Sequence, residues 1–97
     1  MEKVNEVIEI INIMDIKDKL RLAICISQSY CSGLKYNTKD NYEKFDTMLK
    51  EIDEEYRTTL INFGKYKVVM FTIAKIMEIQ EIERNKASLY LFNSVNI

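Results

Sequence analysis

The stretch 41–56, NYEKFDTMLKEIDEEY, carries the most regular pattern in this chain of 97 residues. Its apolar positions step by three and four residues, which places them on one helical face: Tyr42, Phe45, Leu49, Ile52 and Tyr56. The alternation continues through Thr59 to Phe63, and Gly64 follows as a residue that ends or bends a helix. The pattern therefore predicts one long helix over residues 39–63.

Two further helices are expected before this segment. The first has five apolar residues on one face: Val4, Val7, Ile8, Ile11 and Met14. Asp15 then stands where its side chain can accept a hydrogen bond from the first amides of a second helix, over residues 16–32. Because this second helix is apolar nearly all round, we expect it at the centre of the fold. Gly33 follows as a C-terminal cap.

The chain after Gly64 is harder to assign. Residues 68–82 are too apolar to show one narrow stripe, and the length of the run favours a buried helix, although 65–73 alone would equally suit a strand. Asn85 is expected to interrupt the run before a short final helix over residues 87–95. That helix would present Leu89, Phe92 and Val95 on one face, while the alternation of Leu89, Leu91 and Asn93 leaves a strand over 88–96 open.

Composition and connection lengths predict the fold class. Apolar residues make up 47% and charged residues 30% of the chain, the ordinary range for a globular protein. Proline is absent, and glycine occurs only twice. A connection as short as 33–38 makes neighbouring helices pack back on each other. We therefore predict an all-α protein, a single helical domain over 1–97 built as a compact antiparallel helical bundle of four to five helices.

The residue types present argue against catalysis. The chain has no histidine, the commonest general base and metal ligand, and no glycine-rich phosphate loop. Cys25 and Cys31 are too few to complete a common zinc site without histidine. The carboxylates of residues 51–55 could in principle hold a hard cation, but a charge run of this kind is usually the solvated side of a helix. We expect a protein that is not an enzyme and uses no cofactor or metal.

The first hypothesis for function is a protein-binding regulator or inhibitor, such as an adaptor, an immunity protein or a phage anti-defence protein. Over residues 39–57 the acidic residues outnumber the basic ones, so a long helix would present an acidic face to a basic partner protein. The residues expected to bind that partner are Asp46, Glu51, Asp53, Glu54, Glu55 and Tyr56.

The alternative is a small helical subunit of a nucleoprotein complex. Two basic clusters, one of them with an aromatic residue beside its lysines, could contact a nucleic-acid backbone. Their members are Lys17, Lys19 and Arg21, followed by Lys65, Tyr66 and Lys67. The net charge of −1 gives no overall attraction to nucleic acid, so such contact would depend on these clusters alone.

The sequence also indicates location and assembly. The first turn carries Glu2, Lys3 and Glu6 instead of a basic stretch before an apolar run, so we expect no signal peptide. The thiols of Cys25 and Cys31 lie on different sides of the second helix, which fits a reducing cytoplasm. No apolar run is long enough to span a membrane. The high content of aliphatic residues leaves a homo-oligomer open as a further possibility, since one small core could not hide so much apolar surface.

Overall fold

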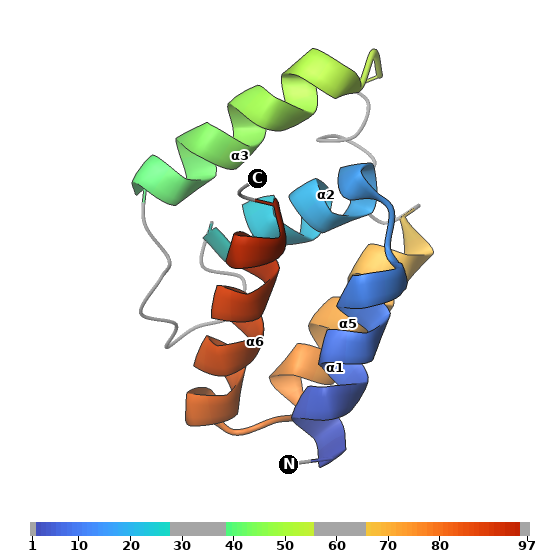
Figure 1. Cartoon of the computed structure of the whole chain (residues 1–97), viewed down its shortest axis with the longest axis vertical. Helices are drawn as coiled ribbons and strands as arrows, with labels where there is room; N and C mark the ends of the chain where they lie inside the picture. Colours follow the sequence, from blue (N-terminus) through green and yellow to red (C-terminus); the bar gives the residue numbers. More distant parts are fainter. Residues whose placement is uncertain (1, 28–38, 56–65, 96–97) are drawn as a thin grey trace.

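The computed structural model describes residues 2–27, 39–55 and 66–95, whose regular structure is entirely helical (Figure 1). The helices are α1 (Glu2–Ile13), α2 (Ile16–Ser27), α3 (Lys39–Ile52), α5 (Lys67–Met77) and α6 (Glu81–Val95). The prediction of an all-α bundle is confirmed. The two strand alternatives, over 65–73 and 88–96, are wrong for every described residue of those segments.

The helices form two groups that cross each other. α1, α5 and α6 run along the length of the molecule, whereas α2 and α3 lie across one end of it, with α3 outermost (Figure 1). α2 contacts α3 on one side and α5 and α6 on the other. Every residue of α2 from Leu20 to Ser27 is buried, Cys25 included, so the predicted central position of this helix is confirmed. Residues 28–38, which include the expected end of this helix and its Gly33 cap, lie outside the described residues.

The turn between α1 and α2 follows from one side chain. α1 ends at Ile13, and the amide of Asp18 donates to Asp15 Oδ1 over 2.8 Å, the hydrogen bond of an N-cap residue. The backbone carbonyl of Asp15 accepts from the amide of Lys19 at 3.0 Å. The predicted cap is therefore confirmed, and it turns the chain within two residues so that α2 crosses α1 instead of extending it.

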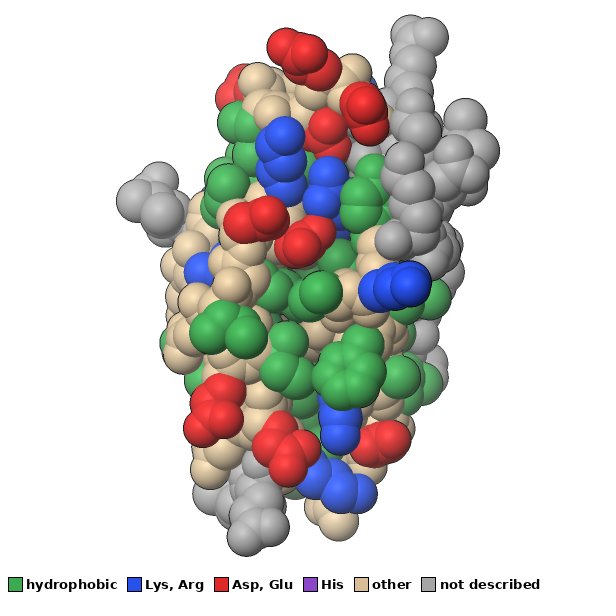
Figure 2. All heavy atoms as spheres, turned by 90° about the vertical axis from the view of Figure 1, so that its right-hand side faces the viewer, with side chains coloured by type: hydrophobic (Ala, Val, Ile, Leu, Met, Phe, Trp, Pro, Cys, Tyr) green, Lys and Arg blue, Asp and Glu red, His purple; other side chains and the backbone are tan. Residues whose placement is uncertain are grey.

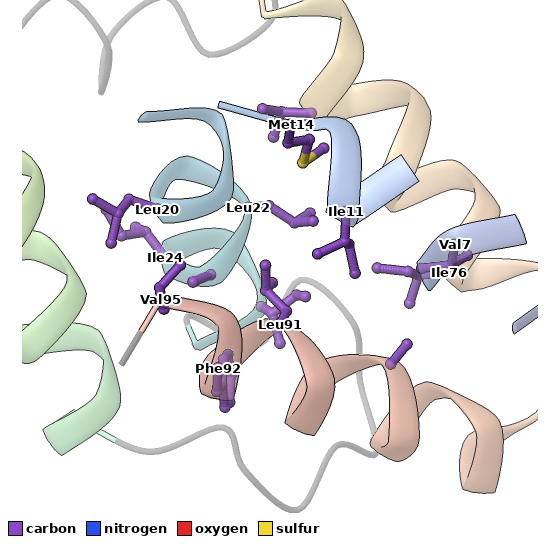
Figure 3. Packing of buried hydrophobic residues seen from close by; sticks show 14 of the residues in the cluster. Val7, Ile11, Met14, Leu20, Leu22, Ile24, Ile76, Leu91, Phe92 and Val95 are labelled. Atoms are coloured by element: carbon purple, nitrogen blue, oxygen red, sulfur yellow. The ribbon is translucent and has the colours of Figure 1, made fainter. Parts of the chain in front are cut away.

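The core lies where these helices meet. Four of the five apolar residues predicted for the first helix are buried, namely Val4, Val7 and Ile11 in α1 and Met14 just after its end, and the fifth, Ile8, packs partly buried against them. Figure 3 shows this row beside Leu22 and Leu91. At the other end of the core, the rings of Phe45 in α3 and Phe92 in α6 lie 5.1 Å apart between centroids and are tilted by 39°.

α3 is shorter than the 3-4 spacing predicts. It ends at Ile52, so the prediction of a continuous helix to residue 63 is wrong, and residues 56–63 lie outside the described part of the chain. Asp53 Oδ1 accepts a hydrogen bond from the amide of Glu55 at 3.0 Å, which stabilises a turn in competition with the helix. Phe45 and Leu49 are fully buried as expected, but Ile52 is 42% exposed.

The break between the last two helices also lies elsewhere than predicted. α5 ends at Met77 and α6 begins at Glu81, whereas Asn85 is an ordinary residue within α6. The Arg84 side chain donates to two backbone carbonyls at the end of α5, to Ile76 at 3.2 Å and to Met77 at 2.8 Å. The last carbonyls of a helix lack intrahelical partners; here the Ile76 carbonyl accepts from the amide of Ile79 as well as from Arg84, and the Met77 carbonyl accepts from Arg84. The expected face of the last helix was partly wrong, because Leu89 is 42% exposed.

Candidate protein-binding site

The structure brings the acidic and the basic candidate residues together where α2 packs against the end of α3. Arg21 of α2 is buried and donates to two carboxylates, to Asp18 Oδ1 at 2.7 Å and to Asp53 Oδ2 at 2.9 Å. The side chain of Asp53 is only 5% exposed. The expectation that Asp53 lies on a solvated helix face is therefore wrong, because this carboxylate is the buried partner of Arg21.

The charge of Arg21 is fixed by this arrangement. Burial of the guanidinium lowers the pKa of Arg21, but the hydrogen bonds to Asp18 and Asp53 outweigh that effect, and the pKa is raised above its ordinary value. Arg21 therefore remains positive throughout the physiological range. Since two of its nitrogens already donate to carboxylates, this side chain is committed to holding α2 and the end of α3 together.

Exposed carboxylates flank Asp53 in the sequence. Glu51, Glu54 and Glu55 are exposed, and the apolar side chain of Ile52 is exposed among them. We call these four residues the acidic corner. Asp53 lies between Ile52 and Glu54 and is held by Arg21, so an ion pair ties the middle of the acidic corner to α2.

A hollow opens beside the acidic corner. Its walls are formed by Lys17, Arg21, Tyr66 and residues 52–55. The guanidinium carbon of Arg21 lies 4.0 Å from the centroid of the Tyr66 ring, a cation–π contact that joins the start of α5 to α2. The surface at this place therefore combines carboxylates with an exposed lysine and a half-buried aromatic ring.

The remaining predicted residues are spread around this site. Asp46 lies on α3, is 16% exposed at its side chain and pairs with Lys50 at 3.5 Å. Lys19 is half-buried, and Lys67, the first residue of α5, is exposed. Tyr56 and Lys65 lie outside the described residues. Among the members of the basic set that the structure describes, Lys17, Arg21 and Tyr66 line the hollow, and Arg21 already donates to two carboxylates.

Comparison with known proteins adds no relative. No family model matches the chain, and no curated protein or solved structure matches it. Within the described ranges, histidine, cysteine, aspartate and glutamate do not gather in a group of three or more that could hold a metal ion. None of the helices described is both long enough and apolar enough to cross a membrane.

A second surface was not predicted from the sequence. A shallow groove between α1 and α5 is lined by Glu6, Glu9, Ile10, Asn12, Ile13, Phe71 and Lys75, and we call it the α1/α5 groove. Ile13 is 85% exposed and Phe71 is 54% exposed. Apolar side chains gather across the middle of this face, with charged side chains towards both ends (Figure 2). The available signal was that Ile10 and Ile13 fall outside the buried face of the first helix.

Proposed function

We propose that this protein is a cytoplasmic, non-catalytic regulator or inhibitor that binds a basic partner protein through the acidic corner. The observation that carries the proposal is that Ile52 is exposed next to the exposed Glu51, Glu54 and Glu55, in a turn that the Arg21–Asp53 ion pair ties to α2. An apolar centre within a charged rim is the usual anatomy of a protein interface. The carboxylates would steer a basic partner, and Ile52 would supply buried apolar contact.

The nucleoprotein alternative has less support at this site. A phosphate backbone that approached Lys17 would also approach Glu54 and Glu55, which line the same hollow. Two nitrogens of Arg21 already donate to Asp18 and Asp53, so this residue adds little attraction for phosphate. A contact that depends on lysines alone would be weakened by these neighbouring carboxylates.

The test is affinity capture from nuclease-treated extract of cells that express the protein. We expect the wild-type chain to retain a protein partner that the double variant Glu51→Gln/Glu54→Gln loses. The matched control is Glu78→Gln/Glu81→Gln, which removes the same charge from two exposed carboxylates, one just after α5 and one at the first residue of α6. If both variants retained the partner equally, the acidic corner would not be the binding surface. Loss of every partner on nuclease treatment would support nucleic-acid binding instead.

A further inference from the structure

The α1/α5 groove is an exposed, partly apolar surface that shares no lining residue with the hollow at the acidic corner. Its apolar residues Ile10, Ile13 and Phe71 come from two helices that lie side by side. Ile13 and Phe71 expose large apolar areas to water. Burial of these areas in an interface would be favourable, because it removes apolar surface from water. The charged residues that line the groove indicate which kind of partner would bind there.

Charge is distributed unequally between the two sides of the groove. The α1 side carries the carboxylates Glu6 and Glu9, and the α5 side carries Lys75. Lys75 Nζ lies 3.7 Å from Glu6 Oε2 and 5.5 Å from the centroid of the Phe71 ring. Glu6 and Lys75 therefore stand at the same level along the two helices.

The apolar residues share a level in the same way. α1 and α5 run in opposite directions (Figure 1). Four residues forward from Glu6 lead to Ile10, and four residues back from Lys75 lead to Phe71. Because both steps are about one helical turn, Ile10 and Phe71 stand opposite each other across the groove, one turn away from the charged pair.

We propose that the α1/α5 groove is the contact surface of a homodimer, in which a second copy of this chain binds through the same groove. A twofold axis that runs along the groove places α1 of each copy on α5 of the other at the same level. Glu6 then faces Lys75 of the second copy, and Ile10 faces Phe71 of the second copy. The surface is self-complementary at these two levels, while Glu9 is a second carboxylate on the α1 side of each copy.

The other twofold arrangement is less favourable. A twofold axis that lies in the interface and runs perpendicular to the helices packs α1 of one copy antiparallel against α1 of the other. Glu6 of one copy then meets the end of α1 that carries Ile13 in the other copy. Each dimer would then cover two carboxylates with apolar surface, and burial of an unpaired charge is costly. The positions of the charges therefore select the arrangement of α1 on α5. This inference does not depend on the function proposed for the acidic corner.

The first test measures the dimerisation constant of the full chain by sedimentation velocity across the micromolar range. We expect a monomer–dimer equilibrium that Ile13→Glu weakens by roughly tenfold or more, because it places two charges in the interface. The matched control is Ile82→Glu on α6, where the native side chain is 69% exposed and outside the groove. Circular dichroism would verify that both variants fold, as expected for exposed positions.

Two results would overturn the proposal. A wild-type chain that remains monomeric across this range would refute the dimer itself. A dimer that Ile82→Glu weakens as much as Ile13→Glu does would refute the groove as its interface. Neither result would bear on capture of a partner by the acidic corner, so the two proposals fail separately.

The second test addresses the arrangement of the two copies. Glu6→Lys and Lys75→Glu each place like charges opposite each other in the dimer, and each is expected to weaken self-association by about three- to tenfold. In an equal mixture of the two variants, the introduced lysine at position 6 opposes the introduced glutamate at position 75. We expect heterodimers with wild-type affinity. A mixture that associates no better than either variant alone would overturn the arrangement.

Discussion

α2 and α5 look alike in the sequence, because each carries apolar residues around most of its circumference. In the structure α2 is buried from Leu20 to Ser27, whereas the buried residues of α5 are only Val69, Thr72 and Ile76. α2 has helices on opposite sides, but α5 lies at the edge of the fold (Figure 1). A helix that is apolar all round therefore marks either the centre of a fold or a surface that needs a partner.

The largest expected effect is in α2. Leu22 is fully buried, so Leu22→Ala removes apolar contacts and leaves a cavity. We expect the free energy of unfolding to fall by about 2–5 kcal/mol. Urea denaturation followed by circular dichroism would measure it, with Ile82→Ala as the exposed control. If the two variants lost equal stability, α2 would not be the centre of the core.

A smaller loss is expected where α2 meets the end of α3. Arg21→Ala leaves the buried carboxylate of Asp53 without its counterion, and we expect a loss of about 2–3 kcal/mol. This is less than for a fully buried pair, because the Arg21 side chain is 10% exposed. Lys17→Ala, an exposed residue one turn earlier, is the control.

The coupling within this pair can be isolated by a double-mutant cycle. Arg21→Ala/Asp53→Ala should lose less stability than the sum of the two single variants, since neither charge is then left buried alone. Additive losses in urea denaturation would show that the two side chains do not stabilise each other.

The smallest effect on folding is expected in α5. Phe71 is 54% exposed, so Phe71→Ala should change the free energy of unfolding of the monomer by no more than about 0.5 kcal/mol. The measurement is thermal unfolding at a concentration low enough to keep the chain monomeric, because binding to a second copy would add stability. A loss as large as that of Leu22→Ala would mean that the exposed side of α5 belongs to the core.

The parts of the fold that depend on local sequence could be predicted. The buried row of α1 follows from the spacing of Val4, Val7 and Ile11, and the cap at Asp15 requires only the residues next to it. The ends of α3 and α5 could not be predicted in this way. α3 ends at a carboxylate held by Arg21, which is 32 residues away, and the carbonyls at the end of α5 are satisfied by Arg84 from the next helix.

The candidate site also combines features that local sequence predicts with features that depend on the packing of distant residues. The sequence indicated the carboxylates near the end of α3 and the basic residues at the start of α2 as two separate candidates. That Lys17 and Glu54 line one hollow depends on how α2 packs against α3, which neither local pattern encodes. Ile13 lies off the apolar face that Val4, Val7 and Ile11 define, and a spacing pattern that predicts the buried face does not predict what covers the other side of the helix.

The contacts of α6 also have a consequence for motion. Arg84 holds the last carbonyls of α5, and the hydroxyl of Tyr90 donates to the side-chain oxygen of Asn12 in α1. Both helices that form the groove are thus tied to the same neighbour, α1 through Asn12, which itself lines the groove, and α5 through its last carbonyls. α5 cannot fray from its C-terminal end without breaking bonds to α6, so α5 and α6 should open and close as one cooperative unit in native-state fluctuations.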